Sequence, residues 1–299
     1  MGTATETPQF NLDVIGRWGD PVEFEVERER IKAYAEATND SIPRHRSGEI
    51  APPVFAIVPA FGALSMASVS AIPPGLLMGV LHGEQDFHYH RPIEPGMTLT
   101  TRAAVIGIQP RSSGVTVVTK GETSEKGADG LVVEQYMTAF VRGGEVETAT
   151  GDEAPPHSFA DELRDRPPDA EVRQTFDADQ TFRYSEASGD PMPIHLDEEV
   201  ARSMGLPGII IHGLCTMAFG SVAVIEHACR EEPERLRRLA VRFSKIVQPE
   251  QEITTRIWRG EETNGRQVLA YETTSDSGDI VIKDGLAEIS AGRPPGSRA

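Results

Sequence analysis

The residues best suited to chemistry in this 299-residue chain lie between positions 184 and 217, which read YSEASGDPMPIHLDEEVARSMGLPGIIIHGLCTM. Asp190 and His195 stand five residues apart, in a segment that two nearby prolines are expected to keep out of a helix. Gly213 directly precedes a long uncharged stretch, and a helix starting there would have a free backbone N–H. The pattern offers an acid, a base and a helix-end amide to one small substrate group.

The loop that carries the acid and the base occurs twice. Residues 34–45 read YAEATNDSIPRH and residues 184–195 read YSEASGDPMPIH, at an offset of 184 − 34 = 150. Asp40 and His45 keep the spacing of Asp190 and His195, so these two residues alone leave a second site open. The first copy continues as APPVFAIVPAF, however, which has no His-Gly pair. The sequence predicts a duplicated unit with its site in the second copy.

Each copy contains an uncharged, helical stretch followed by four alternating runs typical of strands. The helix expected over 213–228 is apolar nearly all round, so it must be wrapped by other elements. Between the copies, residues 143–172 are rich in Pro, Asp and Glu and predict a linker over the surface. The fold class is therefore α+β, with an apolar helix against an antiparallel sheet in each half. The strands are expected at 77–89, 99–108, 115–124 and 131–141, and at 239–247, 253–259, 266–274 and 280–289.

Composition narrows the class of protein. The net charge of −17 argues against nucleic acid and anionic membranes as partners. The uncharged runs 54–72 and 204–225 approach membrane-spanning length, but Pro, Gly and His interrupt them, so we expect buried core helices. The only two cysteines, Cys215 and Cys229, lie in a predicted buried helix and suggest a reducing compartment. With no basic region followed by an apolar run near its start, the chain is expected to be cytoplasmic.

The segment SGDPMPIHLD together with IIIHGL resembles the hydratase 2 motif of the MaoC-like dehydratases, whose fold is the hot dog. In the first half, APPVF and HGEQDFHYHRPIEPG are similar to the N-terminal half of the double hot dog members of that family. The resemblance implies two tandem units, each with an antiparallel sheet curled around a central apolar helix. Residues 1–142 would be a degenerate unit that shapes the acyl tunnel, and residues 173–299 would carry the motif.

The resemblance also implies an activity: (R)-specific hydration of trans-2-enoyl-CoA to 3-hydroxyacyl-CoA, or the reverse dehydration. Asp190 and His195 match the catalytic pair, which would activate one water. Gly213 matches the residue whose N–H meets the thioester carbonyl, and Ser221 matches a serine that helps hold the site. Water adds at C3 only if a base takes its proton while C2 receives one, and this pair can do both on one face.

The substrate would bring its own carrier. Coenzyme A or an acyl carrier arm would be part of an acyl thioester substrate, so no cofactor and no metal are expected. The phosphates of that arm need cations, and Arg242 and Lys245 are candidates because they flank a predicted strand near the site. A homodimer is possible, although the two halves could already form a pseudo-dimer within one chain.

Two other functions use the same residues differently. One is a 3-hydroxyacyl dehydratase that acts on a carrier-protein, polyketide or branched acyl thioester. The other, of a different class, is a non-catalytic acyl-thioester binding protein. Met192 stands where the family has Asn, which removes an amide that could brace the loop. His212 is expected to be a structural partner of the turn, and Cys215 a small core residue rather than a nucleophile.

Overall fold

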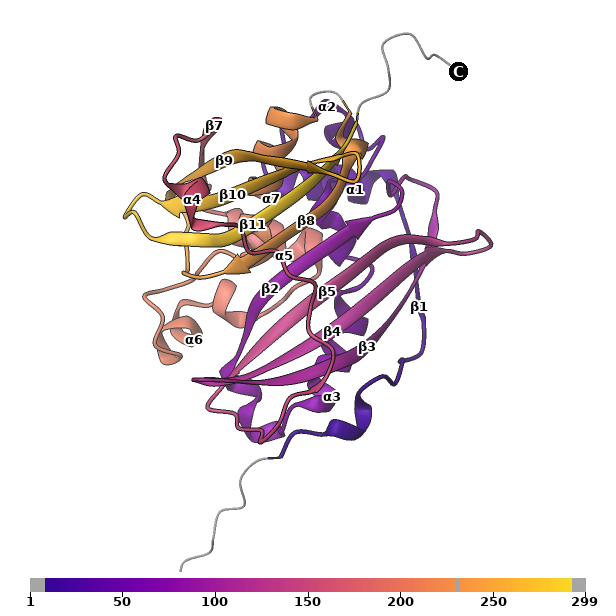
Figure 1. Cartoon of the computed structure of the whole chain (residues 1–299), viewed down its shortest axis with the longest axis vertical. Coiled ribbons are helices and arrows are strands. Elements are labelled where there is room, and N and C mark those ends of the chain that lie inside the picture. The colour runs from indigo at the N-terminus through magenta and orange to yellow at the C-terminus, as the bar shows by residue number, and fades with distance from the viewer. Residues whose placement is uncertain (1–8, 230–231, 292–299) are drawn as a thin grey trace, which may run out of the picture.

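The computed structural model of the chain describes residues 9–229 and 232–291. Its strands form one antiparallel sheet in the order β1-β3-β4-β5-β2-β8-β11-β10-β9-β7, and the short β6 pairs with β3 (Figure 1). The first half of the chain supplies β1 Val22–Glu25, β2 Val80–Tyr89, β3 Thr98–Arg111, β4 Gly114–Glu125, β5 Leu131–Arg142 and β6 Thr150–Gly151. The second half supplies β7 Ala170–Thr175, β8 Leu236–Phe243, β9 Glu252–Thr263, β10 Arg266–Ser275 and β11 Ile280–Ser290.

The helices lie before or between these strands. The α-helices are α1 Arg28–Ala37, α2 Pro43–Arg46, α3 Phe61–Ala71, α4 Asp161–Arg164, α5 Gln180–Ser188, α6 Glu198–Ser203 and α7 Gly213–Ala228. The 3-10 turns are η1 Leu12–Val14, η2 Pro53–Ile57, η3 Pro74–Gly79, η4 Pro193–His195 and η5 Pro233–Arg235. No helix in the described part of the chain is both long and apolar enough to cross a membrane.

The two halves join through β2 and β8, which lie side by side in the middle of the sheet (Figure 1). Asp86 is paired with Ala240 at the centre of this ladder, so the equivalent strands face each other about a local twofold axis. Tyr34 of α1 and Tyr184 of α5, which the repeat makes equivalent, also meet across the two halves, with their hydroxyl oxygens 3.3 Å apart. The duplication predicted from the sequence therefore corresponds to two halves that share one continuous sheet and one apolar core.

The helix α7 matches the predicted span, and every residue from Leu214 to Ile225 is buried. Its all-round apolar character is explained because β8, β9 and β11 and the neighbouring segments enclose it. The first-half run 54–72 was expected to be a buried core helix, and this is wrong in two respects. It divides into η2 and α3 around Pro59, and Met66 of α3 is 74% exposed. The strands β3 and β4 cover only one side of α3.

The predicted linker 143–172 is more structured than its composition suggests. It contains β6 and α4, and β7 begins at Ala170 inside the predicted range. The segment crosses the outer face of the sheet (Figure 1), where His157 is buried and its Nδ1 donates to the Asp284 carbonyl at 2.7 Å. Arg238 of β8 donates to the Pro156 carbonyl at 3.0 Å. Hydrogen bonds from side chains to main-chain carbonyls can order a polar segment without large apolar side chains.

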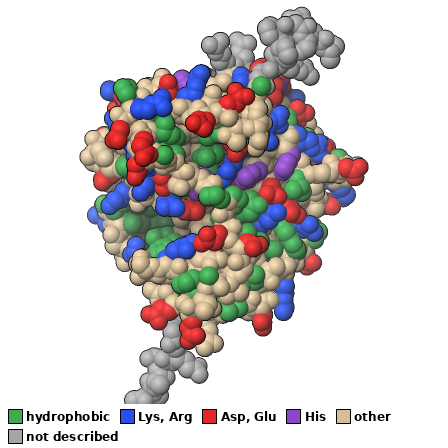
Figure 2. All heavy atoms as spheres, in the orientation of Figure 1, with side chains coloured by type: hydrophobic (Ala, Val, Ile, Leu, Met, Phe, Trp, Pro, Cys, Tyr) green, Lys and Arg blue, Asp and Glu red, His purple; other side chains and the backbone are tan. Residues whose placement is uncertain are grey.

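Charged side chains of both signs are interspersed over this outer face, as Figure 2 shows. At the seam between the halves, Arg238 of β8 donates two hydrogen bonds to Asp86 of β2, at 3.1 and 2.8 Å. Both side chains are almost fully buried. This ion pair satisfies two charges that would otherwise be costly to bury, and it fixes β2 against β8.

Candidate active site

Asp190 follows α5 after a left-handed turn at Gly189, whose φ of 79° favours glycine. The Ser185 hydroxyl donates to the Asp190 main-chain carbonyl at 2.6 Å, which fixes the chain at this point. The Asp190 carboxylate accepts one hydrogen bond, from the Met192 main-chain N–H at 3.1 Å. Among the described residues its other oxygen has no hydrogen-bonding partner, so the carboxyl can still bind a water molecule.

His195 ends the 3-10 turn η4, so the predicted non-helical loop contains one short turn of 3-10 geometry. Its Nδ1 lies 2.7 Å from the Ile210 carbonyl oxygen. A carbonyl can only accept, so Nδ1 carries the proton and the neutral ring has its lone pair on Nε2. Within the described chain Nε2 has no hydrogen-bond partner, and unlike the Nε2 of His45 it is not fully buried. His195 therefore presents a basic nitrogen to the site.

Gly213 opens α7, and His212 is its N-cap residue without a side-chain capping bond. The first N–H groups of the helix have no acceptor within the helix, so they point out of its end. A Cβ on Gly213 would lie 3.2 Å from two ring carbons of Phe243, so the absent side chain lets β8 approach closely. The Asp190, His195 and His212 side chains place one ligand-type atom each within 4.8 Å of one another beside this helix end.

Burial sets the protonation of the pair. Removal from water raises the pKa of Asp190 above its usual 3.8, although the Met192 N–H and nearby His195 oppose the change. The same desolvation lowers the pKa of His195 below 6.5, against the effects of the Ile210 carbonyl and the Asp190 charge. The first shift brings the pKa of Asp190 closer to neutral pH, and the second keeps His195 unprotonated there, in the form that can accept a proton.

The Asp190, His195 and His212 group has the residue types of a metal site, but its geometry does not suit one. The rings of His195 and His212 stack at a centroid distance of 3.7 Å and an interplanar angle of 24°. Lone pairs lie in the ring planes, so those of two stacked imidazoles run side by side. Metal ligands must instead converge on one point. The arrangement fits proton transfer better than metal binding.

The other predicted site residues lie at different places. Ser221 is buried in α7 and its hydroxyl donates to the Ala218 carbonyl at 2.7 Å. It follows Gly213 by eight residues, about 12 Å along the helix axis, so the structure does not bring it to the helix end. Arg242 of β8 is ion-paired with Glu84 at 2.7 Å. Lys245, just beyond β8, is exposed and has no ion pair within the described residues.

The first-half counterpart is closed. His45 Nδ1 lies 2.7 Å from the Asp40 carboxylate, and neither side chain is exposed by more than 1%. The site is followed by Pro52 as N-cap residue and Pro53 as first residue of η2, in the positions of His212 and Gly213. The main-chain bond from Ala51 N to the Ile93 carbonyl likewise repeats the bond from Ile211 N to the Val247 carbonyl.

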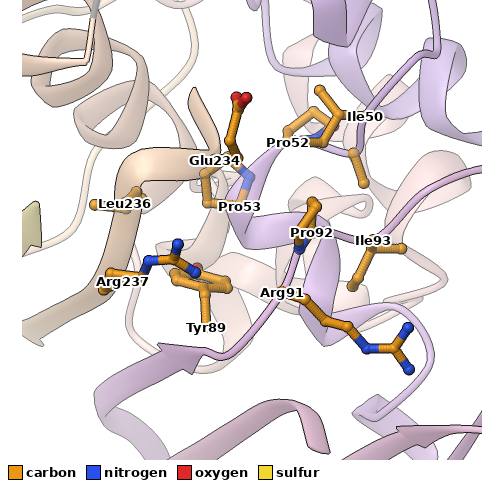
Figure 3. Close-up of a pocket in the computed structure, with 11 residues that line it drawn as sticks. Ile50, Pro52, Pro53, Tyr89, Arg91, Pro92, Ile93, Glu234, Leu236 and Arg237 are labelled. Atoms are coloured by element: carbon orange, nitrogen blue, oxygen red, sulfur yellow. The ribbon is translucent and has the colours of Figure 1, made fainter. Parts of the chain in front are cut away.

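A small cleft of about 30 Å³ lies in front of these two prolines (Figure 3). Tyr89 and Arg91 of the first half and Arg237 of β8 also line it, but Asp40 and His45 do not. A proline has no N–H to donate, so the cleft offers no helix-end amide at this position. The first half therefore lacks both parts needed for a thioester reaction. Its Asp-His pair is buried, and its helix start has no N–H at this position.

Sequence reasoning missed four features of the site. The Ile210 carbonyl orients His195, Phe243 packs on Gly213, and the ring of His82 from β2 meets the Phe243 ring at 5.0 Å. The stacking of His212 on His195 was also missed. Only His212 had a signal in the sequence, since it adjoins the glycine of the motif. The other contacts depend on how the sheet brings β2 and β8 against the start of α7.

Comparisons with known proteins show the family and the fold. Residues 160–279 match the family described as MaoC like domain, and residues 13–135 match the FAS1-like, dehydratase domain region. The Mycobacterium tuberculosis protein named 3-hydroxyacyl-thioester dehydratase Y is 33% identical over 249 residues, covering 80% of this chain and 82% of its own. The Dictyostelium discoideum protein named "Probable enoyl-CoA hydratase 2" is 28% identical over 277 residues, covering 90% and 92%.

Among solved structures, a MaoC-like dehydratase from Phytophthora capsici superposes with a TM-score of 0.81 at 25% identity, covering 94% of this chain and 99% of its own. The tandem hot dog fold defines the class. The chain belongs to the MaoC-like dehydratase family, and the predicted double hot dog fold is confirmed.

Proposed function

We propose that this chain catalyses the (R)-specific hydration of trans-2-enoyl-CoA to 3-hydroxyacyl-CoA and the reverse dehydration. One observation carries the proposal: the Nε2 of His195 and the carboxyl of Asp190 both keep bonding capacity for a water beside the start of α7. Membership of the MaoC-like family supports it, as do relatives named enoyl-CoA hydratase 2 and 3-hydroxyacyl-thioester dehydratase Y.

In the proposed reaction one water bridges the pair. His195 Nε2 takes a proton from it, because Nδ1 is already protonated and bonded to Ile210. The oxygen adds to C3, and the neighbouring Asp190 carboxylate stabilises the imidazolium that forms. The pair then returns the proton to C2 as the enolate collapses. Atoms and charges balance, the dyad ends as it began, and both additions come from one face.

The thioester carbonyl becomes negative while C3 is attacked. In this proposal the Gly213 N–H, first in α7, donates to that oxygen, and the aligned amides of the helix add a favourable dipole. Loss of one such donor in other enzymes costs about 3 kcal/mol, or roughly 10²–10³ in rate. This residue is therefore proposed as the carbonyl anchor, with Asp190 and His195 as the catalytic pair.

The carrier arm is proposed to approach along the end of β8. Lys245 is exposed there, while Arg242 is already paired with Glu84, so Lys245 is the better candidate for contact with a phosphate. Ser221 stays a prediction as a residue that supports the site from within α7. Neither metal nor redox cofactor enters this mechanism. The homodimer also stays a prediction.

Physiological dehydration is the second candidate, favoured by the 33% identity to the protein named 3-hydroxyacyl-thioester dehydratase Y. The same groups would act in reverse, because the forward and reverse reactions pass through the same transition states. A carrier-protein thioester could replace the CoA thioester at the same site. The buried, unpaired Cys215 and Cys229 support a reducing compartment such as the cytoplasm.

The test is the loss of enoyl-thioester absorbance when purified protein meets crotonyl-CoA and a longer trans-2-enoyl-CoA. Asp190→Asn should remove turnover, whereas the matched variant Asp40→Asn should retain it. Chiral analysis of the product should give the (R)-3-hydroxyacyl thioester. Failure of folded wild-type protein to hydrate either substrate, or to dehydrate the matching 3-hydroxyacyl-CoA, would count against the enzyme and favour a non-catalytic binder.

A further inference from the structure

His212 contacts both members of the dyad, although the mechanism above gives it no role. Its ring stacks on His195 with centroids 3.7 Å apart, and its Nε2 lies 3.4 Å from the Asp190 main-chain carbonyl. The same ring also meets Tyr184 of α5, at a centroid distance of 4.9 Å and an interplanar angle of 51°. His212 is thus held between α5 and the turn that carries His195.

The hydrogen bond of His212 fixes its tautomer, and its lowered pKa fixes its charge. Because the Asp190 carbonyl only accepts, Nε2 must carry the proton. Nδ1 is then a bare acceptor, and it is buried without a partner within the described chain. Burial, together with the nearby charge that His195 can carry, lowers the pKa of His212 to about 2. The residue therefore stays neutral at physiological pH and presents an uncharged, planar ring to His195.

We propose that His212 is a positioning residue for the hydration reaction. Its ring covers one face of His195 while its N–H holds the Asp190 main chain, so the catalytic base, the carboxyl and the Gly213 amide keep a fixed relative geometry. This inference rests on the proposed function for its kinetic consequences. Small displacements matter at such sites, because a shift of about 1 Å can cost roughly 10²-fold in rate.

The His212 ring also limits hydration of the base. Desolvation is the largest cause of the lowered His195 pKa, and His212 shields part of that ring. The other ionisable groups near the turn are Asp190 on the same loop, Tyr184 behind His212, and Glu198, Glu199 and Arg202 on the adjoining α6. None of these replaces the stacked ring, so its removal admits water and the pKa of His195 rises toward 6.5.

Three variants separate the two contacts of His212. His212→Ala removes the stacked ring and the N–H donor, His212→Phe keeps a ring without the donor, and His212→Gln keeps a donor without the ring. The readouts are kcat and KM on crotonyl-CoA, the acid limb of kcat/KM, and the NMR titration of the His195 ring proton. That NMR signal is assigned by its loss in His195→Asn, and circular dichroism checks folding.

We expect His212→Ala to lower kcat about tenfold or more with little change in KM. The acid limb of kcat/KM and the NMR titration of His195 should both move to higher pH. His212→Phe should recover most of kcat and the wild-type titration, and His212→Gln should recover less. Unchanged kcat and titration in His212→Ala would overturn the inference. If His212→Ala fails to fold, equal losses of kcat in His212→Phe and His212→Gln would overturn the inference.

The two proposals fail in different ways. Wild-type protein that hydrates no enoyl thioester contradicts the proposed function, but the His195 titration still shows whether His212 shields the ring. Wild-type turnover with unaffected His212 variants contradicts only the role of His212.

Discussion

The two copies of the Asp-His loop bond the same imidazole nitrogen to different partners. In the first half, His45 Nδ1 binds the Asp40 carboxylate at 2.7 Å and both side chains are sealed. In the second half, His195 Nδ1 binds the Ile210 carbonyl instead, and the Asp190 carboxyl keeps a free oxygen. The first pair bonds to itself and leaves His45 Nε2 buried without a partner in the described chain, while the second has bonding capacity open to a water.

The difference continues into the next helix start. Pro53 occupies the first position of η2, where it cannot donate, while Gly213 occupies the first position of α7. Residue spacing alone therefore does not make a catalytic site. The partner of Nδ1 and the residue at the helix start decide which copy can hold both a water and a carbonyl.

Gly213→Pro would give the second half the helix start of the first. His212 has φ −59° and ψ 134°, which suits a residue before proline, and proline is tolerated at the first helical position. The fold should survive while the amide is lost, so kcat/KM for enoyl-CoA hydration should fall by roughly 10²–10³.

Gly213→Ala is the matched control, because it adds the same Cβ near Phe243 but keeps the N–H. It should lose clearly less activity than the proline variant. Equal losses in the two variants would mean that crowding by the Cβ, not the amide, matters.

The larger loss of stability is expected from the first-half histidine, although activity depends on the second-half one. His45→Ala leaves the buried Asp40 carboxylate with only the Ile42 N–H, so the free energy of unfolding should fall by about 3 kcal/mol. His195→Ala removes a bond to a neutral carbonyl at an open site and should cost about 1 kcal/mol. Urea unfolding followed by circular dichroism measures both, and a larger loss in His195→Ala would contradict this division of roles.

The pH dependence of activity follows from the two opposed pKa shifts. The active form needs ionised Asp190 and neutral His195, and acidification removes both. Burial raises the pKa of Asp190 above 3.8 and lowers that of His195 below 6.5, so kcat/KM should fall on acidification, with the His195 step below pH 6.5. Each pH unit should cost about tenfold while one of the two groups is protonated, and about a hundredfold once both are. A His195 step above pH 6.5, in protein that remains folded, would be inconsistent with a desolvated base.

Met192→Asn should have the smallest effect. Met192 is 48% exposed and its main-chain N–H already binds Asp190, so the loop keeps its shape without an amide side chain. Restoring the asparagine typical of the family should raise kcat/KM by at most a few-fold and change stability by less than about 0.5 kcal/mol. Steady-state kinetics beside Met192→Ala would separate the added amide from the lost methionine, and a large fall in activity would mean that Met192 itself binds substrate.

Much of the fold was predictable because its signals are local. The helix over 213–228 is apolar on all sides, and the eight long strands alternate in the expected way, so both appear close to their predicted positions. The predicted elements were wrong where tertiary contacts outweigh local composition. A polar segment became β7 because β9 offers it a hydrogen-bonding edge, and residues 77–79 belong to η3 rather than to β2.

The site was predictable only in part. The duplicated loop identified Asp190 and His195 as candidates, and the His-Gly pair distinguished the two halves. What the spacing could not give is which atom each ring binds. The bond to Ile210 and the stack on His212 arise when α7, its preceding segment and η4 come together. The partners of Arg242 depend likewise on the β2–β8 register, which no local pattern encodes.

The most direct test of the central claim compares the turnover of His195→Ala and His45→Ala on the same enoyl-CoA, at equal concentrations of folded protein. The first variant should lose all measurable hydration while the second keeps most of it, because the Nε2 of His195 is open to a water and that of His45 is buried. Equal losses of kcat in the two variants would contradict a single site in the second half.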